Sequence, residues 1–132
     1  PLPPNAPTPE PAQPSISGQP GPAASLTGNA DGGKALFGKY CAACHGPEGV
    51  LGVANPDSDD GSVPSLNPID PTIANADPKV FAANIDRFIE HGSVPSGPSP
   101  LIMMPAFGDG HLLTNQQIAD IIAYLIASNQ GR

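Results

Sequence analysis

The sequence predicts an all-α domain, and three observations lead to this prediction. Segments at about residues 31–44, 78–91 and 115–128 repeat apolar residues at the i, i+3, i+4 spacing of one helix face. No segment alternates apolar and polar residues over the length of a strand. Residues 46–76 and 93–112 between these segments contain many prolines and are too long for simple turns, which is typical of loops that wrap around something.

Residues 1–28 precede this pattern and are predicted to be a spacer. Nine of the 19 prolines fall within residues 1–22. This composition predicts an extended or disordered linker, which either tethers the domain to an upstream anchor or partner or remains from processing. The first residues lack the basic and then apolar pattern of a signal peptide, so we expect a mature or trimmed terminus. The domain itself then comprises residues 29–132, which suits one small globule.

The first helix is expected to begin with Asp31 as its N-cap and to run through Cys44. Both cysteines then lie on the side that faces the core, because the apolar stripe of this helix consists of Gly33, Leu36, Phe37, Tyr40, Cys41 and Cys44. Glycine is a poor helix former, so its presence on this stripe at position 33 indicates close approach of another backbone.

The second and third helices carry clear end signals. Asp77 is the expected N-cap of the second helix, with Pro78 at its first position and Gly92 just past its end. Its predicted buried face is Phe81, Ile85, Phe88 and Ile89. The third helix begins with a capping box formed by Thr114 and Gln117. Its inward side chains are predicted to be Ile118, Ile121, Ile122 and Leu125, flanked by Tyr124.

Composition limits the classes of partner. Five Lys and Arg residues against twelve Asp and Glu residues give a formal net charge of -7, which argues against nucleic acid or an anionic lipid surface. The dense acidic run "DSDDG" at residues 57–61 lacks the spacing of a calcium loop and is expected to be solvated. The sequence contains no run of 18 or more apolar residues, so it predicts no membrane span. Aromatic residues make up only 5% of the chain, so a bulky cofactor would help to fill its small core.

The pentapeptide "CAACH" at residues 41–45 contains both cysteines of the chain. A structural zinc site needs four ligands, and without a second cysteine pair it would have to use His91 or His111. A thioredoxin-like redox pair belongs after a strand in a βαβ unit, which the helical pattern does not offer. Covalent haem attachment needs two sulfurs about one helical turn apart with an adjacent histidine, and the pentapeptide supplies this arrangement.

A haem iron bound by His45 needs a sixth ligand or keeps an open site. The candidates are Met103, Met104, His91, His111 and the lysine side chains. Thioether sulfur is a soft ligand that raises the reduction potential, which suits electron transfer. A methionine in a loop often only fills the core, but two methionines before a proline are less easily explained in this way.

Three stretches together, "GKALFGKYCAACHG", "MPAFG" and "LTNQQIADIIAYL", resemble the class I c-type cytochromes over about residues 30–130. The resemblance implies a cytochrome c-like fold, with about three main helices and long loops wrapped around one covalently attached haem c. It implies thioether bonds from Cys41 and Cys44 and axial iron ligation by His45 and Met104. Met103 remains the alternative to Met104, and ligation by two histidines remains open, chiefly through His111.

The resemblance also assigns roles to residues around the ligands. The first and last helices are expected to cross where Gly33 and Phe37 meet Ile121 and Tyr124. The carbonyl of Pro64 is expected to accept a hydrogen bond from His45, and Tyr40 and Phe107 are expected beside the haem. We expect His91 to interact with the last carbonyls of its helix and His111 to be a turn residue.

The function implied by this resemblance is the transfer of single electrons between protein redox partners, without catalysis by the chain itself. Lys34, Lys39 and Lys79 are too few for a basic docking face, so the partners should present a basic or an apolar one. The alternative is a haem c subunit or domain of a larger membrane-associated oxidoreductase, for example in a respiratory chain. A ligand-sensing haem domain would require an open sixth position. Because haem is attached covalently outside the cytoplasm, the resemblance implies a periplasmic or extracytoplasmic location. If the proline-rich segment is a tether, the membrane anchor is expected upstream of residue 1.

Overall fold

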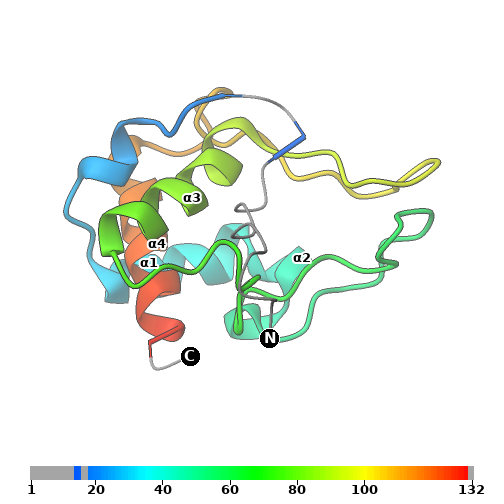
Figure 1. The fold of residues 1–132 in the computed structure, drawn as a ribbon, viewed down its shortest axis with the longest axis horizontal. Coiled ribbons are helices and arrows are strands. Elements are labelled where there is room, and N and C mark those ends of the chain that lie inside the picture. Colours follow the sequence, from blue (N-terminus) through cyan, green and yellow to red (C-terminus); the bar gives the residue numbers. More distant parts are fainter. Residues whose placement is uncertain (1–13, 16–17, 131–132) are drawn as a thin grey trace, which may run out of the picture.

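The computed structural model describes residues 14–15 and 18–130, and over these residues the fold is all-α, as predicted. Its helices are η1 (Pro22–Ser25), α1 (Ala30–Tyr40), α2 (Ala42–His45), η2 (Pro47–Gly49), α3 (Pro78–His91) and α4 (Asn115–Ser128), where η marks a 3₁₀ helix. Long loops connect α2 to α3 and α3 to α4 (Figure 1). Within the described ranges, the extended pairing consists of two isolated bridges, Ala54 with Ser62 and Ser93 with Met104.

The N-cap of α1 is Asn29, so the prediction of Asp31 was wrong by two residues. The side-chain oxygen of Asn29 accepts a hydrogen bond from the backbone N–H of Gly32 at 3.0 Å. Asparagine is as good an N-cap residue as aspartate. Asp31 lies instead in the first turn, where its negative charge is favourable near the positive end of the helix dipole.

The first helix does not run unbroken to Cys44, as the sequence had predicted. It ends at Tyr40, Cys41 is its C-cap, and the short helix α2 follows. The break changes which residues face inward: Phe37 is buried, Cys41 is half-buried against the core, and Tyr40 is 36% exposed. Cys44 is half-buried. The two cysteines therefore lie at the edge of the core.

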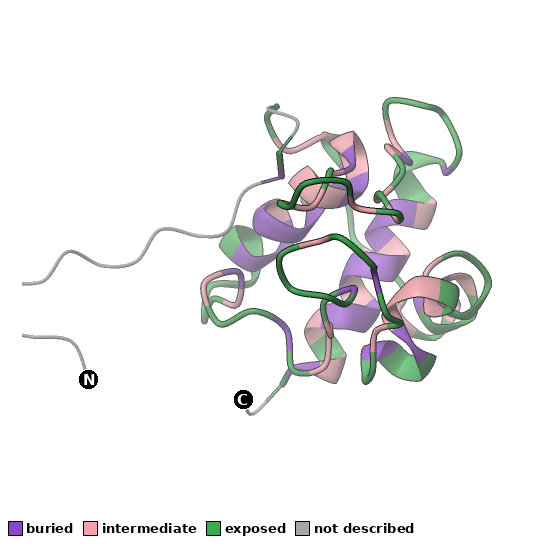
Figure 2. Ribbon diagram, turned by 90° about the vertical axis from the view of Figure 1, so that its right-hand side faces the viewer, coloured by how far each residue is buried: buried purple, intermediate pink, exposed green. Residues whose placement is uncertain are grey.

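The predicted ends of α3 and α4 are confirmed. The side chain of Asp77 accepts a hydrogen bond from the N–H of Lys79 at 2.9 Å, and Gly92 follows α3 with a positive φ of 71°. Both hydrogen bonds of the capping box between Thr114 and Gln117 are present at the start of α4. Of the predicted inward side chains on these two helices, Phe88 alone is half-buried, while the others are buried (Figure 2).

Helices α1 and α4 pack closely against each other, and the predicted contact residues lie at their crossing. A Cβ atom on Gly33 would overlap the carbonyl group of Asp120 on α4. The rings of Phe37 and Tyr124 lie 5.5 Å apart between centroids, in a tilted arrangement. Phe37 and Ile121 are each 1% exposed, so this crossing forms the centre of the core.

Part of the segment predicted as a spacer packs on the domain. Ala23 in η1 is 1% exposed, and η1 contacts both α3 and α4. The backbone N–H of Ala24 donates a hydrogen bond to the carboxylate of Asp86 on α3 at 3.0 Å. The prediction that residues 1–28 form a spacer outside the core was therefore wrong for η1. Small side chains such as that of Ala23 can fill a gap between two helices even in a proline-rich context. Residues 1–13 and 16–17 of the predicted linker lie outside the described residues.

Among the described residues, no helix combines the length and the hydropathy that crossing a bilayer requires.

Candidate functional site

The two cysteines are half-buried free thiols that lie one turn apart along the chain. Cys41 is the C-cap of α1, and Cys44 lies inside α2. Burial raises the pKa of the Cys41 thiol to about 12, and the neighbouring Cys44 adds to this shift. A thiol with such a pKa stays protonated at neutral pH, whereas zinc binding and disulfide exchange both use thiolates. The environment of Cys41 therefore favours neither of the alternatives to haem attachment.

The tautomer of the His45 ring is fixed by a hydrogen bond. Its Nδ1 atom lies 2.8 Å from the carbonyl oxygen of Pro64, as the resemblance implied. A carbonyl only accepts, so Nδ1 carries the proton and the lone pair is on Nε2. Burial lowers the pKa of the imidazole, while the Pro64 hydrogen bond opposes this effect. A neutral imidazole held by a carbonyl through Nδ1–H is the form in which histidine binds metals.

The structure distinguishes the two methionines. Met103 is 58% exposed, whereas Met104 is half-buried and packs against the core. The backbone of Met104 is held by Ser93: the N–H of Met104 donates to the Ser93 carbonyl at 2.9 Å, and the carbonyl of Met104 accepts from the N–H of Ser93 at 3.1 Å. Pro105 follows directly and disfavours helical backbone at Met104. The half-buried Met104 on its anchored backbone is therefore better placed to be a ligand than the exposed Met103.

Tyr40 and Phe107, which were expected beside the haem, contact each other. Their rings are 6.5 Å apart between centroids and meet edge to face. Phe107 is buried, and the ammonium group of Lys39 lies 5.2 Å from the centroid of the Tyr40 ring. The pair joins the end of α1 to the loop that follows Met104.

The other two histidines do not offer a free ligand in the same way. His91 has both ring nitrogens bonded: Nδ1 to the carboxylate of Asp109 at 2.8 Å and Nε2 to the carbonyl of Gln19 at 2.7 Å. Both partners are acceptors, which favours the protonated ring, and the hydrogen bond with Asp109 raises its pKa. These partners replace the helix-end carbonyls that the sequence suggested. His111 is exposed in a turn with a φ of 55°.

A zinc site finds no further support. Across the part of the chain that the structure describes, no group of three or more His, Cys, Asp or Glu side chains could hold a metal ion. The two residues that zinc would have to use, His91 and His111, are respectively bonded elsewhere and exposed.

The sequence did not indicate that Asn55 contributes to this site. It is 1% exposed, and its amide side chain exchanges two hydrogen bonds with the backbone of Ile102, two residues before Met104. In sequence, an asparagine before a proline indicates only a turn, and nothing local indicates a partner 47 residues away.

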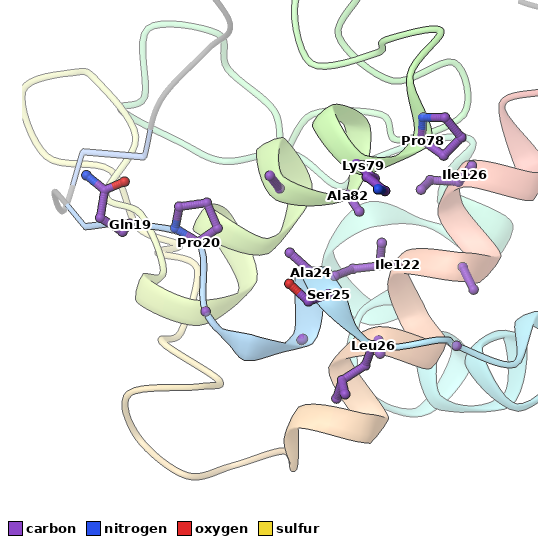
Figure 3. Close-up of a pocket in the computed structure, with 16 residues that line it drawn as sticks. Gln19, Pro20, Ala24, Ser25, Leu26, Pro78, Lys79, Ala82, Ile122 and Ile126 are labelled. Carbon is purple, nitrogen blue, oxygen red and sulfur yellow. The ribbon is translucent and has the colours of Figure 1, made fainter.

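Two surface hollows lie away from most of these residues. One, of about 820 Å³, is lined by η1, α3 and α4, with Pro20, Ala24, Ala82 and Ile122 on its walls (Figure 3). The other, of about 950 Å³, lies beside Pro64, Ile69 and Phe81. Neither is lined by the cysteines, His45 or Met104, so the chemistry of the site depends on its donor groups. Two thiols one turn apart, an imidazole with a free Nε2 and a half-buried thioether are together a donor set that fits a covalently bound haem.

Comparison with known proteins gives one match. The family model described as cytochrome C oxidase, cbb3-type, subunit III matches residues 28–125. The comparisons with curated proteins and with solved structures gave no match.

Proposed function

The chain belongs to the family of cbb3-type cytochrome c oxidase subunit III and is a c-type cytochrome, and from this premise we propose that it is a monohaem protein that transfers single electrons between protein partners. Cys41 and Cys44 form the two thioether bonds, and His45 and Met104 bind the iron. One pair of cysteines in the whole sequence supports a single haem. The hydrogen bond between His45 and Pro64 carries this proposal, because it leaves Nε2 free to bind iron.

The haem, when bound, supplies an iron that gains and loses one electron. The chain's own residues keep the ligands in place during this change. Pro64 fixes the orientation of the His45 ring, and Ser93 holds the backbone of Met104. The buried ring of Phe107 helps to keep water away from the site, and Tyr40 meets it edge to face. Ligands that move little between the two redox states leave little to reorganise, so transfer is fast, and the chain needs no catalytic group of its own.

The second candidate function is that of a haem c subunit or domain within a larger membrane-associated oxidoreductase. The family description favours it, since it names a subunit of an oxidase. In either case the partners present a basic or an apolar docking face to this acidic chain, and the location is periplasmic or extracytoplasmic. The part of the chain that precedes η1 would connect the domain to a membrane anchor. Stable co-purification with other subunits from native membranes supports the second candidate, whereas isolation as a lone protein supports the first.

Absorption spectra of the oxidised and reduced protein test the cofactor and its ligand together. The unmodified protein is expected to show a c-type band when reduced and a sulfur-to-iron charge-transfer band when oxidised. Met104→Ala should lose the charge-transfer band, and carbon monoxide should then bind the reduced iron readily. Met103→Ala is the matched control and should keep both properties of the unmodified protein.

Three results would contradict the proposal or a part of it. A purified protein with the mass of its amino acids alone, colourless in both redox states, would exclude covalent haem. Loss of the charge-transfer band in Met103→Ala but not in Met104→Ala would exchange the roles of the two methionines. Rapid carbon monoxide binding by the unmodified reduced protein would instead indicate an open site and a ligand-sensing domain.

A further inference from the structure

The loop that follows α2 and the loop that leads to Met104 are joined by one buried side chain. The amide nitrogen of Asn55 donates to the carbonyl of Ile102 at 3.0 Å, and the Asn55 oxygen accepts from the N–H of Ile102 at 2.8 Å. The side chain thus bonds to both backbone groups of one residue, as a neighbouring strand would. Asn55 is 1% exposed, so water cannot easily replace these two bonds.

Asn55 is itself firmly held within its own loop. Its N–H donates to the carbonyl of Gly61 at 2.9 Å, and its carbonyl accepts from the hydroxyl of Ser58 at 2.8 Å. The adjacent residue Ala54 forms an antiparallel bridge with Ser62. These contacts fix the backbone of Asn55, and so fix the position from which its amide side chain bonds to Ile102.

The same loop is bonded to the segment that contains His45. The N–H of Val53 donates to the carbonyl of Cys44 at 2.9 Å. The carbonyl of Val53 accepts from Val63 at 2.8 Å, and the next residue, Pro64, accepts from His45. The loop at residues 53–64 therefore contacts the His45 segment at two points and the Met104 loop through Asn55. In Figure 1 these two loops extend from the helices on the same side of the molecule as α2.

The Met104 loop needs such a support. Residues 93–103 form no helix. Besides the two bonds of Asn55, three backbone hydrogen bonds join this segment to the 53–64 loop: Leu101 bonds to Pro56, Ser99 to Asp57, and Ser96 to Asp59. Leu101, Ser99 and Ser96 are all exposed. Ser93 holds Met104 to the end of α3 but not to the His45 segment.

We propose that Asn55 is a positioning residue, which sets the place of the Met104 loop relative to the His45 segment and so keeps the Met104 sulfur bound to iron. This inference rests on the proposed function, because it gives Asn55 a role only if Met104 is a ligand. Asn55 itself need not touch the haem. Its loss would leave the N–H and carbonyl of Ile102 without partners in a half-buried place and would let the loop move away.

The test compares Asn55→Ala with Asn84→Ala in the haem-containing protein. Asn84 is a matched control because it is 5% exposed and its side chain bonds to a different loop, at the Ile73 carbonyl, 3.0 Å away. Urea unfolding gives two midpoints, one for loss of the sulfur-to-iron band and one for loss of helical circular dichroism. A separate measurement gives the rate of carbon monoxide binding to the reduced protein. Asn55→Asp is a second variant, with the same shape and the Ile102 N–H bond but without the donor to the Ile102 carbonyl.

Asn55→Ala is expected to lose the sulfur-to-iron band at clearly lower urea than it loses helix, and to bind carbon monoxide about tenfold faster or more. In Asn84→Ala both midpoints should fall together and the rate should stay unchanged. If Asn55→Ala does not fold, Asn55→Asp should show the same separation of midpoints. The proposal is overturned if the Asn55 variants behave like Asn84→Ala. A missing sulfur-to-iron band in the unmodified protein would instead refute Met104 ligation, and with it both proposals.

Discussion

Burial acts strongly on Asp86, a carboxylate on α3. It is fully buried, at 0% exposure, and among the described residues its Oδ1 atom has no hydrogen-bond partner. Burial raises its pKa to about 6, Glu90 adds to this shift, and the hydrogen bond from Ala24 opposes it. The ordinary pKa of this carboxyl is 3.8, so the folded state binds a proton at Asp86 more tightly than the unfolded chain does.

Asp86→Asn is expected to stabilise the protein at pH 7. The stability that protonated Asp86 provides is fully present below about pH 4 and is lost as pH rises through about 6. A shift of this size corresponds to roughly 2–3 kcal/mol, so the variant should gain on the order of 1–3 kcal/mol at pH 7. Urea unfolding of both proteins at several pH values measures this difference. A difference in unfolding free energy that does not change between pH 4 and pH 7 would contradict the raised pKa.

At the scale of the elements, the crossing of α1 and α4 depends on a missing side chain. Gly33 is buried against the Asp120 carbonyl, and a Cβ there would also approach the Tyr124 side chain at 2.9 Å. Gly38 lies on the same helix, is exposed and has open space around it. One helix thus contains a glycine that packing requires and another that packing does not use.

The two glycines are expected to respond to alanine with opposite signs. Gly33→Ala should destabilise the protein by about 1–3 kcal/mol, because the new methyl group forces α1 away from α4. Gly38→Ala should stabilise it by about 0.5–1 kcal/mol, because alanine restricts the unfolded chain and favours helix. Thermal unfolding of the two variants beside the unmodified protein gives both values. Equal effects of the two substitutions would mean that the helices do not cross at Gly33.

For the molecule as a whole, the formal charge of -7 should govern electron exchange with charged reagents. A cationic metal complex should react faster than an anionic one of similar potential, and its rate should fall as salt is added. The anionic reagent should show the opposite salt dependence. Stopped-flow measurement at several ionic strengths tests this. Rates that are independent of salt for both reagents would point to an apolar docking face as the dominant one.

The whole molecule should also depend on its haem for folding. Its helices and a few loop residues form one small core with few aromatic side chains. Cys41→Ser combined with Cys44→Ser, produced without haem, is therefore expected to be largely unfolded. Circular dichroism during heating is the measurement. A cooperative thermal transition in this haem-free variant would contradict the expectation.

The sequence alone determined the features that depend on near neighbours in the chain. The caps at Asp77 and Thr114, the extents of α3 and α4, and the spacing of Cys41, Cys44 and His45 are all encoded within a few residues. The same local rules misplaced the N-cap of α1 and extended this helix past Tyr40, because several adjacent residues satisfy them equally.

Only the tertiary structure decided which distant residues meet. The hydrogen bonds of Ala24 to Asp86 and of Asn55 to Ile102 join segments that are far apart in sequence. The tertiary structure likewise makes Met104 half-buried and Met103 exposed. Pro64 was expected near His45 by resemblance, and its carbonyl lies at hydrogen-bond distance only because the loop folds back over α2. The physical reason is that hydrogen bonding and burial depend on distance in space, which a local pattern of residue types does not specify.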